Sequence, residues 1–289
     1  MTMRRLLPVL LAALSITAVT TGAASAAPRF TEYVALGDSA AAGPLIPNQD
    51  VLHLGCLRST RNWPSVLAES LGAATFRDVT CSGAVADDME GGQTTFLGPV
   101  PPQFDALTPT TDLVSLTIGG NDIGLVGAAL GCVNLLPEPI GVSCEARLTA
   151  GGVDQLAAKI DAFGPEFAAV LDGIHARSPH AKIVVVGYGT YIRPGGCYPV
   201  QPLWGRDSDY LQASIERLNG VFATEAARHG ATFLDIVPPS AGHDVCAPIP
   251  QRWFEGLVPT TVAAPLHPNQ RGMAGIGAYL ADALSDSVS

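Results

Sequence analysis

The stretch Thr31-Glu32-Tyr33-Val34-Ala35-Leu36-Gly37-Asp38-Ser39 decides the fold of this chain. Residues 31–36 form an alternating, strand-like run, and Gly37 breaks it just before Asp38 and Ser39. Ser39 is therefore expected at the carboxyl end of a sheet strand. Open α/β sheets bind their ligands in the crevice at that edge, so the Ser39 hydroxyl is the first candidate functional group.

Further strand-like runs end near Gly, Asn or Pro, at residues 113–118, 183–186 and 232–236. Helical patterns alternate with them, at residues 63–71, 153–177, 209–229 and 271–284. This alternation predicts a parallel sheet between helical layers, and near-continuous apolar strands predict burial on both faces. Two Pro- and Gly-rich stretches, 91–109 and 188–204, have no period and are expected on the surface as walls of a substrate cleft.

The N-terminus is typical of a secretory signal peptide. Arg4 and Arg5 precede an apolar stretch over residues 6–19, and Ala24-Ser25-Ala26 supplies the small residues of a cleavage site. A membrane anchor would need about 20 consecutive apolar residues, but residues 17–25 are rich in Thr, Gly and Ser. We therefore predict a signal peptide over residues 1–26, secretion, and a single domain over residues 27–289.

The charge of the chain restricts its partners. The 289 residues carry a formal net charge of -10, and loss of the two arginines in residues 1–26 makes it -12. The charge argues against nucleic acid as a partner, because phosphate contacts need clustered Lys and Arg. Anionic membrane surfaces are disfavoured on the same grounds, and no stable membrane insertion is expected. Nothing in the sequence requires more than a monomer.

Six cysteines remain in the predicted mature chain, and in an exported protein an even set favours disulfides. Fifteen connectivities are open, and pairing in sequence order is the most economical. Metal binding is the competing interpretation, but no Cys-x-x-Cys pair or Cys/His cluster has ligand spacing, so no metal and no cofactor are expected. The sequential pairs are Cys56–Cys81, Cys132–Cys144 and Cys197–Cys246.

Four short motifs carry the functional signal. In chain order they are Gly37-Asp38-Ser39, Gly83 within Cys81-Ser82-Gly83-Ala84, Gly119-Gly120-Asn121-Asp122, and His267-Pro268-Asn269. With them the chain resembles the SGNH, or GDSL-type, hydrolase family. The cysteine spacing and the segment 241–246 are similar to those of its secreted bacterial lipases and esterases. The resemblance implies a flavodoxin-like three-layer α/β/α fold, with a central parallel sheet, and a serine acyl-enzyme mechanism.

Ser39 is the candidate nucleophile, because a serine hydroxyl attacks an acyl carbonyl when a base removes its proton. The tripeptide alone would equally suit a β-turn in which Asp38 bonds backbone amides. Gly83 and Asn121 are candidate oxyanion donors together with the backbone N–H of Ser39, since pre-aimed donors stabilise the tetrahedral intermediate. Gly83 alone could be a turn glycine, and Asp122 is expected to be a helix N-cap or turn former.

His267 is the candidate general base, since imidazole can both accept and return a proton near neutral pH. His243 is its main competitor, because it neighbours Asp244 and could imitate a His–acid pair.

This chain departs from the family pattern three residues before His267. Many members carry an aspartate there to orient the imidazole, whereas this chain has Ala264. Either a backbone carbonyl of Ala264 or Pro265 accepts the imidazole N–H, or a carboxylate reaches in from Asp235 or Asp244. We favour the carbonyl, and hence a Ser-His dyad.

The predicted function is a secreted serine esterase or lipase acting on acyl glycerols, phospholipids or simple fatty-acyl esters. Apolar runs at 123–126 and 128–130, with Phe254, Leu257 and Val258, favour a greasy acyl chain. One alternative is a carbohydrate acetylesterase, but a glycan site needs exposed aromatics and these make up only 6% of the chain. The other alternative is a binding protein that kept the fold and lost activity. No ligand cluster or phosphate-binding glycine loop supports a metalloprotease or a phosphatase.

Overall fold

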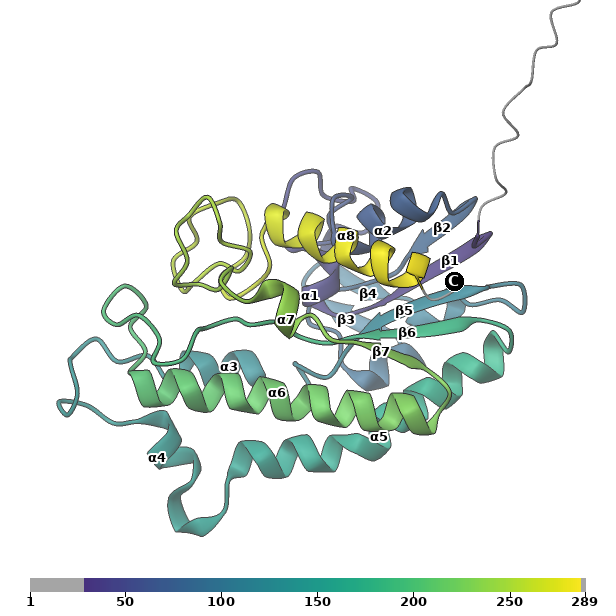
Figure 1. The fold of residues 1–289 in the computed structure, drawn as a ribbon. Coiled ribbons are helices and arrows are strands. Elements are labelled where there is room, and N and C mark those ends of the chain that lie inside the picture. The colour runs from purple at the N-terminus through teal and green to yellow at the C-terminus, as the bar shows by residue number, and fades with distance from the viewer. Residues whose placement is uncertain (1–28, 287–289) are drawn as a thin grey trace, which may run out of the picture.

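The computed structural model describes residues 29–286, so the predicted signal peptide lies outside the described part of the chain. Five strands form one parallel sheet in the order β2-β1-β5-β6-β7 (Figure 1). They are β1 (Glu32–Gly37), β2 (Thr75–Asp78), β5 (Leu113–Thr117), β6 (Lys182–Val186) and β7 (Thr232–Leu234). The register pairs Val34 with Val114 and Val114 with Ile183.

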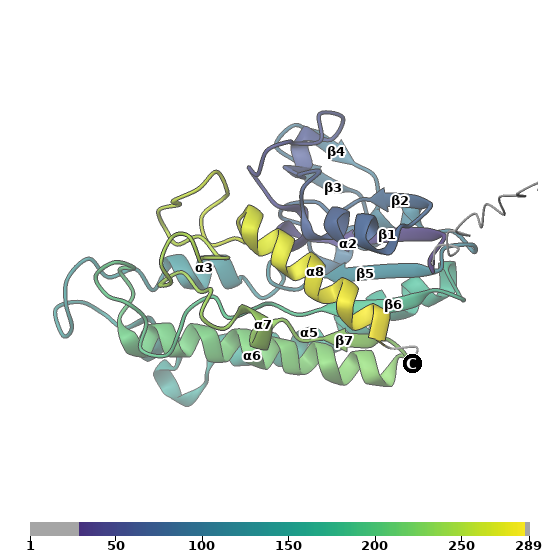
Figure 2. The ribbon, with the colours of Figure 1, turned by 45° about the horizontal axis from the view of Figure 1, so that its top comes forward.

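Helices cover both faces of this sheet (Figures 1 and 2). On one face α2 (Trp63–Leu71) packs against α8 (Gln270–Asp286), and their core includes Tyr33 and Ala35 of β1. On the other face α5 (Gln155–Arg177) packs against α6 (Gly205–Arg228), over a core that includes Val34 and Leu36. Successive side chains of a strand point to opposite faces, so β1 supplies both cores. The predicted three-layer α/β/α fold is confirmed.

Shorter elements lie between these: α1 (Ser39–Ala42), α3 (Leu125–Leu130), α4 (Cys144–Leu148), α7 (Val237–Ser240), β3 (Gln93–Thr95) and β4 (Gly98–Val100). The expectation of an irregular stretch over 91–109 is wrong, because β3 and β4 form a hairpin and a 3-10 helix follows at Gln103–Ala106. The sequence also missed β2, an edge strand with charged Arg77 and Asp78 and no apolar pattern. No helix within residues 29–286 is long and apolar enough to cross a membrane.

The structure joins all six cysteines in sequence order, as Cys56–Cys81, Cys132–Cys144 and Cys197–Cys246. All three bonds lie in segments that follow the carboxyl end of a strand or connect two such segments.

Buried side-chain amides complete the backbone hydrogen bonding where the strands end. The amide of Gln103 accepts the N–H of Gly37 at 2.8 Å and donates to its carbonyl at 2.9 Å. Asn219, on α6, makes the same pair of bonds to Tyr188 at 2.9 and 2.7 Å. Each amide replaces the neighbouring strand that is missing at that position, so the residues that follow β1 and β6 have fixed backbones.

Candidate active site

Ser39 follows β1 directly and begins the short helix α1. Gly37 holds a φ of +147°, and a Cβ there would lie 2.6 Å from the Thr117 carbonyl oxygen, so glycine is required at this close approach. The amide N–H of Asp38 donates to the same oxygen at 2.9 Å. Ser39 is thereby held beside β5 at the carboxyl edge, as the sequence predicted.

His267 lies against Ser39, with Nε2 at 2.7 Å from Oγ. Its Nδ1 is 2.7 Å from the carbonyl oxygen of Pro265. Because that oxygen can only accept, the proton of the neutral ring belongs on Nδ1, which leaves the Nε2 lone pair facing the Ser39 hydroxyl. Burial lowers the pKa of His267 from its ordinary value, although the Pro265 carbonyl acts in the opposite direction. The imidazole is therefore neutral near pH 7.

The turn before His267 gives this geometry. Leu266 has a left-handed φ of +61°, unusual for a residue with a branched side chain. The amide of Leu266 donates to the carbonyl of Glu255 at 3.1 Å, and the amide of Glu255 donates to the carbonyl of His267 at 2.9 Å. The chain consequently folds back so that the ring of His267 meets the Pro265 carbonyl. The amide of Ala264 donates to the carbonyl of Pro44 at 3.1 Å and anchors the start of this turn.

Asn121 follows β5 and lies in the wall of the same pocket as Ser39 and His267. Its Nδ2 donates to the carbonyl of Ala84 at 2.8 Å, which fixes the amide and leaves its second N–H available. The neighbouring Gly83 has a φ of +84°. Among the described residues, the backbone N–H groups of Gly83 and Ser39 have no hydrogen-bond acceptor. Two of these donors, on Ser39 and Asn121, belong to residues that line the pocket, whereas Gly83 does not line it.

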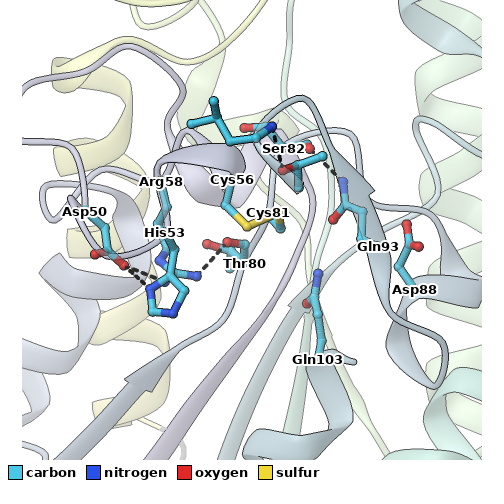
Figure 3. Close-up of a disulfide and its surroundings, with 12 residues drawn as sticks. Asp50, His53, Cys56, Arg58, Thr80, Cys81, Ser82, Asp88, Gln93 and Gln103 are labelled. Atoms are coloured by element: carbon cyan, nitrogen blue, oxygen red, sulfur yellow. Dashed lines mark hydrogen bonds and ion pairs between the residues drawn. A yellow bond between two sulfur atoms is a disulfide. The ribbon is translucent and has the colours of Figure 1, made fainter. Parts of the chain in front are cut away.

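The loop that carries Gly83 is anchored next to the Cys56–Cys81 disulfide (Figure 3). The amide of Ser82 donates to the Cys56 carbonyl at 2.9 Å, and Gln93 Nε2 donates to the Ser82 carbonyl at 2.9 Å. Gln93 lies on β3, so the hairpin of β3 and β4, which was not predicted, supports the loop that carries Gly83 and does not line the pocket.

A buried polar chain connects three strand ends beneath the site. The amide of Gly120 donates to Tyr188 Oη at 2.9 Å, and Tyr188 Oη is 2.5 Å from Asp38 Oδ2. Since the Gly120 amide can only donate, the tyrosine proton must point to Asp38. Asp38 Oδ1 accepts the amide of Ala40 at 2.8 Å. Burial raises the pKa of Asp38 to about 7, although the Tyr188 hydroxyl acts to lower it.

This chain, which we call the Asp38–Tyr188 bridge, ties the residue before Ser39 to the residue before Asn121. The alternative interpretation of the tripeptide had Asp38 bonding backbone amides in a β-turn; its side chain does bond the Ala40 amide, but as the N-cap of the helix α1. No sequence pattern indicated Tyr188, which lies in the aperiodic stretch 188–204.

The other candidate acids and bases are engaged elsewhere. Asp244 accepts Arg193 Nε at 3.0 Å, and Asp235 accepts the Val237 amide at 2.9 Å. His243 Nδ1 bonds the Gln251 carbonyl while its ring stacks on Trp253.

Asp122 is also engaged, since its Oδ1 accepts the amide of Ala86 at 2.8 Å and so holds the loop after Gly83. It is not the N-cap of α3, because Gly124 occupies that position.

Glu255 is a second buried carboxylate, and no sequence pattern indicated its role. It accepts the amide of Thr260 at 2.6 Å, the hydroxyls of Thr260 and Thr261 at 2.9 and 2.7 Å, and Nδ2 of Asn269 at 2.8 Å. Burial alone would raise its pKa, but these donors hold the pKa below its ordinary value. Glu255 therefore organises the loop that presents His267.

An apolar pocket opens at Ser39. The empty space in and around it is about 770 Å³, a figure that includes open solvent at its mouth. Most of its lining is aliphatic and comprises Leu125, Val126, Ala129, Ile192, Leu203, Leu211, Ile215 and Val245. The apolar run after Asn121 lines the pocket as expected, but Phe254, Leu257 and Val258 do not, because Phe254 is buried under Tyr191 and Val258 faces solvent.

No group of three or more His, Cys, Asp or Glu side chains within the described residues could hold a metal ion. The arrangement at Ser39 offers a nucleophile, a base and the N–H donors of Ser39 and Asn121 at one apolar pocket, which together suit acyl transfer.

Comparison with known proteins agrees with this geometry. The model of the GDSL-like Lipase/Acylhydrolase family matches residues 35–274. Lipase 2 of Streptomyces coelicolor is 38% identical over 280 residues, which cover 94% of this chain and 92% of that protein. A lipase of Streptomyces rimosus is 34% identical over 254 residues, covering 87% of each.

Solved structures give the same result. Phospholipase A1 from Streptomyces albidoflavus is 29% identical with a TM-score of 0.73, covering 89% of this chain and all of that one. The extracellular lipase from Streptomyces rimosus is 30% identical at the same TM-score and coverage.

Proposed function

The chain belongs to the GDSL-like lipase/acylhydrolase family and is a carboxylic ester hydrolase, and from this premise we propose that it hydrolyses fatty-acyl esters through an acyl-enzyme on Ser39. The observation that carries the proposal is the 2.7 Å contact between Ser39 Oγ and the Nε2 atom of His267, at the mouth of an aliphatic pocket. The substrate class comprises acyl glycerols, phospholipids and simple fatty-acyl esters. We also propose that the protein is secreted, as its N-terminal sequence predicts.

In the proposed reaction His267 Nε2 takes the Ser39 proton as Oγ attacks the ester carbonyl carbon. The carbonyl oxygen becomes an oxyanion that the N–H groups of Ser39, Gly83 and Asn121 stabilise, one such donor being worth about 2.7–4 kcal/mol. The imidazolium returns its proton to the departing alcohol. A water molecule, deprotonated by the same ring, then releases the fatty acid and restores Ser39.

The imidazolium is oriented by the Pro265 carbonyl, which makes the pair a Ser-His dyad. A neutral carbonyl stabilises the positive ring less than a carboxylate would, so the base is weaker than that of a triad. The low pKa of the buried ring has a compensating effect, because it keeps the free base available in mildly acidic solution.

The test is hydrolysis of p-nitrophenyl esters from acetyl to palmitoyl, with Ser39→Ala and His267→Ala beside His243→Ala as a matched histidine control. We expect turnover that peaks at medium or long chains, falls by about 10⁴-fold or more in the first two variants, and persists in the control. An acetyl-only profile would support a carbohydrate acetylesterase instead. Absence of turnover in the folded wild type would leave a binding protein of the same fold.

A further inference from the structure

The exposed large apolar side chains are unevenly distributed over the molecule. Within residues 29–286 all of them lie in segments that follow the carboxyl end of a strand, and none lies on the long helices α2, α5, α6 and α8. The segments that lead from the long helices α2, α5 and α6 back into a strand carry none of them either. Isolated exposed apolar residues are normal on any protein, but their confinement to one edge of the sheet needs an explanation.

Three of these segments also form the walls of the acyl pocket, and they lie together at the left of Figure 1. They are α3 with the loop after it, the loop before α6, and the loop before α8. We call their exposed apolar side chains the apolar rim: Val126, Leu130, Leu135, Leu136, Ile140, Val142, Val200, Ile249, Val258 and Val262.

The apolar rim is continuous with the pocket. Val126 belongs to both, since it lines the pocket and is 39% exposed. Trp204 Nε1 donates to the carbonyl of Leu136 at 2.9 Å, and so ties the loop after α3 to the loop before α6. The amide of Leu257, next to Val258, donates to the pocket-lining Gln201 at 3.1 Å.

Charge is sparse where most of the rim residues lie. Residues 123–142, 196–204 and 256–266 contain one side chain that is charged near pH 7, Glu138, and no Lys or Arg, whereas residues 241–255 around Ile249 contain Asp244, Arg252 and Glu255. The protein as a whole is acidic, with a formal charge of -10. A surface that attracted anionic lipid would need basic residues, so the apolar rim suits a neutral or zwitterionic surface.

The position of the pocket mouth identifies the occupant. Anything that rests on the apolar rim also covers the entrance to Ser39, and a protein partner there would block the substrate. The surface of a lipid aggregate instead presents the substrate to the entrance. We propose that the apolar rim docks on neutral or zwitterionic lipid aggregates and so delivers acyl esters to the pocket. This inference rests on the proposed function, because the lipid surface must contain the substrate.

Sedimentation with phosphatidylcholine vesicles tests the proposal, using the Ser39→Ala protein so that the lipid stays intact. We expect binding to phosphatidylcholine, and weaker binding when phosphatidylglycerol is added. Leu135→Ser with Leu136→Ser should reduce the partition coefficient at least about tenfold, because apolar area drives insertion. Val258→Ser should reduce it less. Val51→Ser with Leu52→Ser is the matched control, since these residues are 77% and 83% exposed but lie outside the apolar rim.

The same substitutions in the Ser39 protein should leave hydrolysis of dissolved p-nitrophenyl butyrate unchanged while slowing hydrolysis of aggregated long-chain ester. The proposal is overturned if the parent protein does not bind vesicles, if the rim variants bind as well as the parent, or if the control pair loses as much binding. A protein that binds vesicles through the rim but hydrolyses no ester would instead refute the proposed function.

Discussion

Two buried carboxylates flank the candidate active site, and the structure treats them in opposite ways. Asp38, on the Ser39 side, accepts two hydrogen bonds, and burial raises its pKa to about 7. Glu255, on the His267 side, accepts four, and its pKa is lowered despite burial. Neither forms a salt bridge within the described residues.

The difference separates a charge that stabilises the fold from one that the fold tolerates. A lowered carboxyl pKa means that the folded state favours the anion, so Glu255 contributes to stability. A raised pKa means that the folded state disfavours it, so Asp38 is retained for another reason. Its bond to the Tyr188 hydroxyl suggests that the reason is the alignment of Ser39 with Asn121.

The largest expected effect is on stability, at Glu255. Glu255→Gln keeps the shape but places an NH₂ group among donors, and we expect the free energy of unfolding to fall by about 3 kcal/mol. The activity of each folded molecule should change only a few-fold. Urea denaturation with active-site titration measures both. The control is Glu90→Gln, whose side chain is 79% exposed and pairs with Arg177, and it should change stability by less than about 1 kcal/mol.

Tyr188→Phe should affect activity more than stability, which is the reverse of the effect of Glu255→Gln. Losing the hydroxyl leaves the Gly120 amide and one Asp38 oxygen without a partner, and we expect kcat to fall about 10- to 100-fold with little change in KM. Tyr33→Phe is the matched control, because Tyr33 makes an equally buried bond of 2.7 Å to Ser115 within the sheet, away from the pocket. Equal losses of kcat in the two variants would contradict a role of the Asp38–Tyr188 bridge in positioning.

The two carboxylates should also give opposite pH dependences of stability. With a folded-state pKa of about 7 against 3.8 in the unfolded chain, Asp38 binds more protons when folded. Its contribution to unfolding free energy therefore declines from about pH 4 to pH 7, by roughly 4 kcal/mol. Asp38→Asn should remove that decline. The contribution of Glu255 is present above its ordinary pKa of 4.5 and is lost as the pH falls through its lower folded-state value.

The smallest effects are expected at the acids that the structure places away from His267. Asp244→Asn and Asp235→Asn should each change kcat by less than about threefold, since their side chains bind Arg193 and the Val237 amide. A loss near 10⁴-fold, like that of a removed triad acid, would show that a carboxylate orients the imidazole after all.

Local signals explain why much of the molecule could be predicted. The strand ending at Gly37 and the helix at 63–71 carry their own periodicity and punctuation, and the structure has both. The motifs around Ser39, Asn121 and His267 follow strand ends or precede a helix, so topology alone predicts that they meet.

Long-range side-chain pairing could not be predicted in this way. The Asp38–Tyr188 bridge joins residues 150 positions apart, and Glu255 meets Asn269 across a loop without a repeating pattern. Gln103 reaches Gly37 over 66 positions. Such partners are chosen by the packed fold, because a buried polar group takes whichever complement the surrounding elements bring near.

The amides of Gln103 and Asn219 have a consequence for how this scaffold can change. Since they satisfy the peptide groups of Gly37, at the end of β1, and of Tyr188, two residues after β6, the loops beyond those strands do not have to supply these hydrogen bonds. Insertions, deletions and new side chains in the loops can then change the shape of the acyl pocket without breaking the hydrogen bonds of the sheet. The hydrogen bonding of the framework does not depend on these loops, so new substrate preferences can evolve by changes in the loops alone.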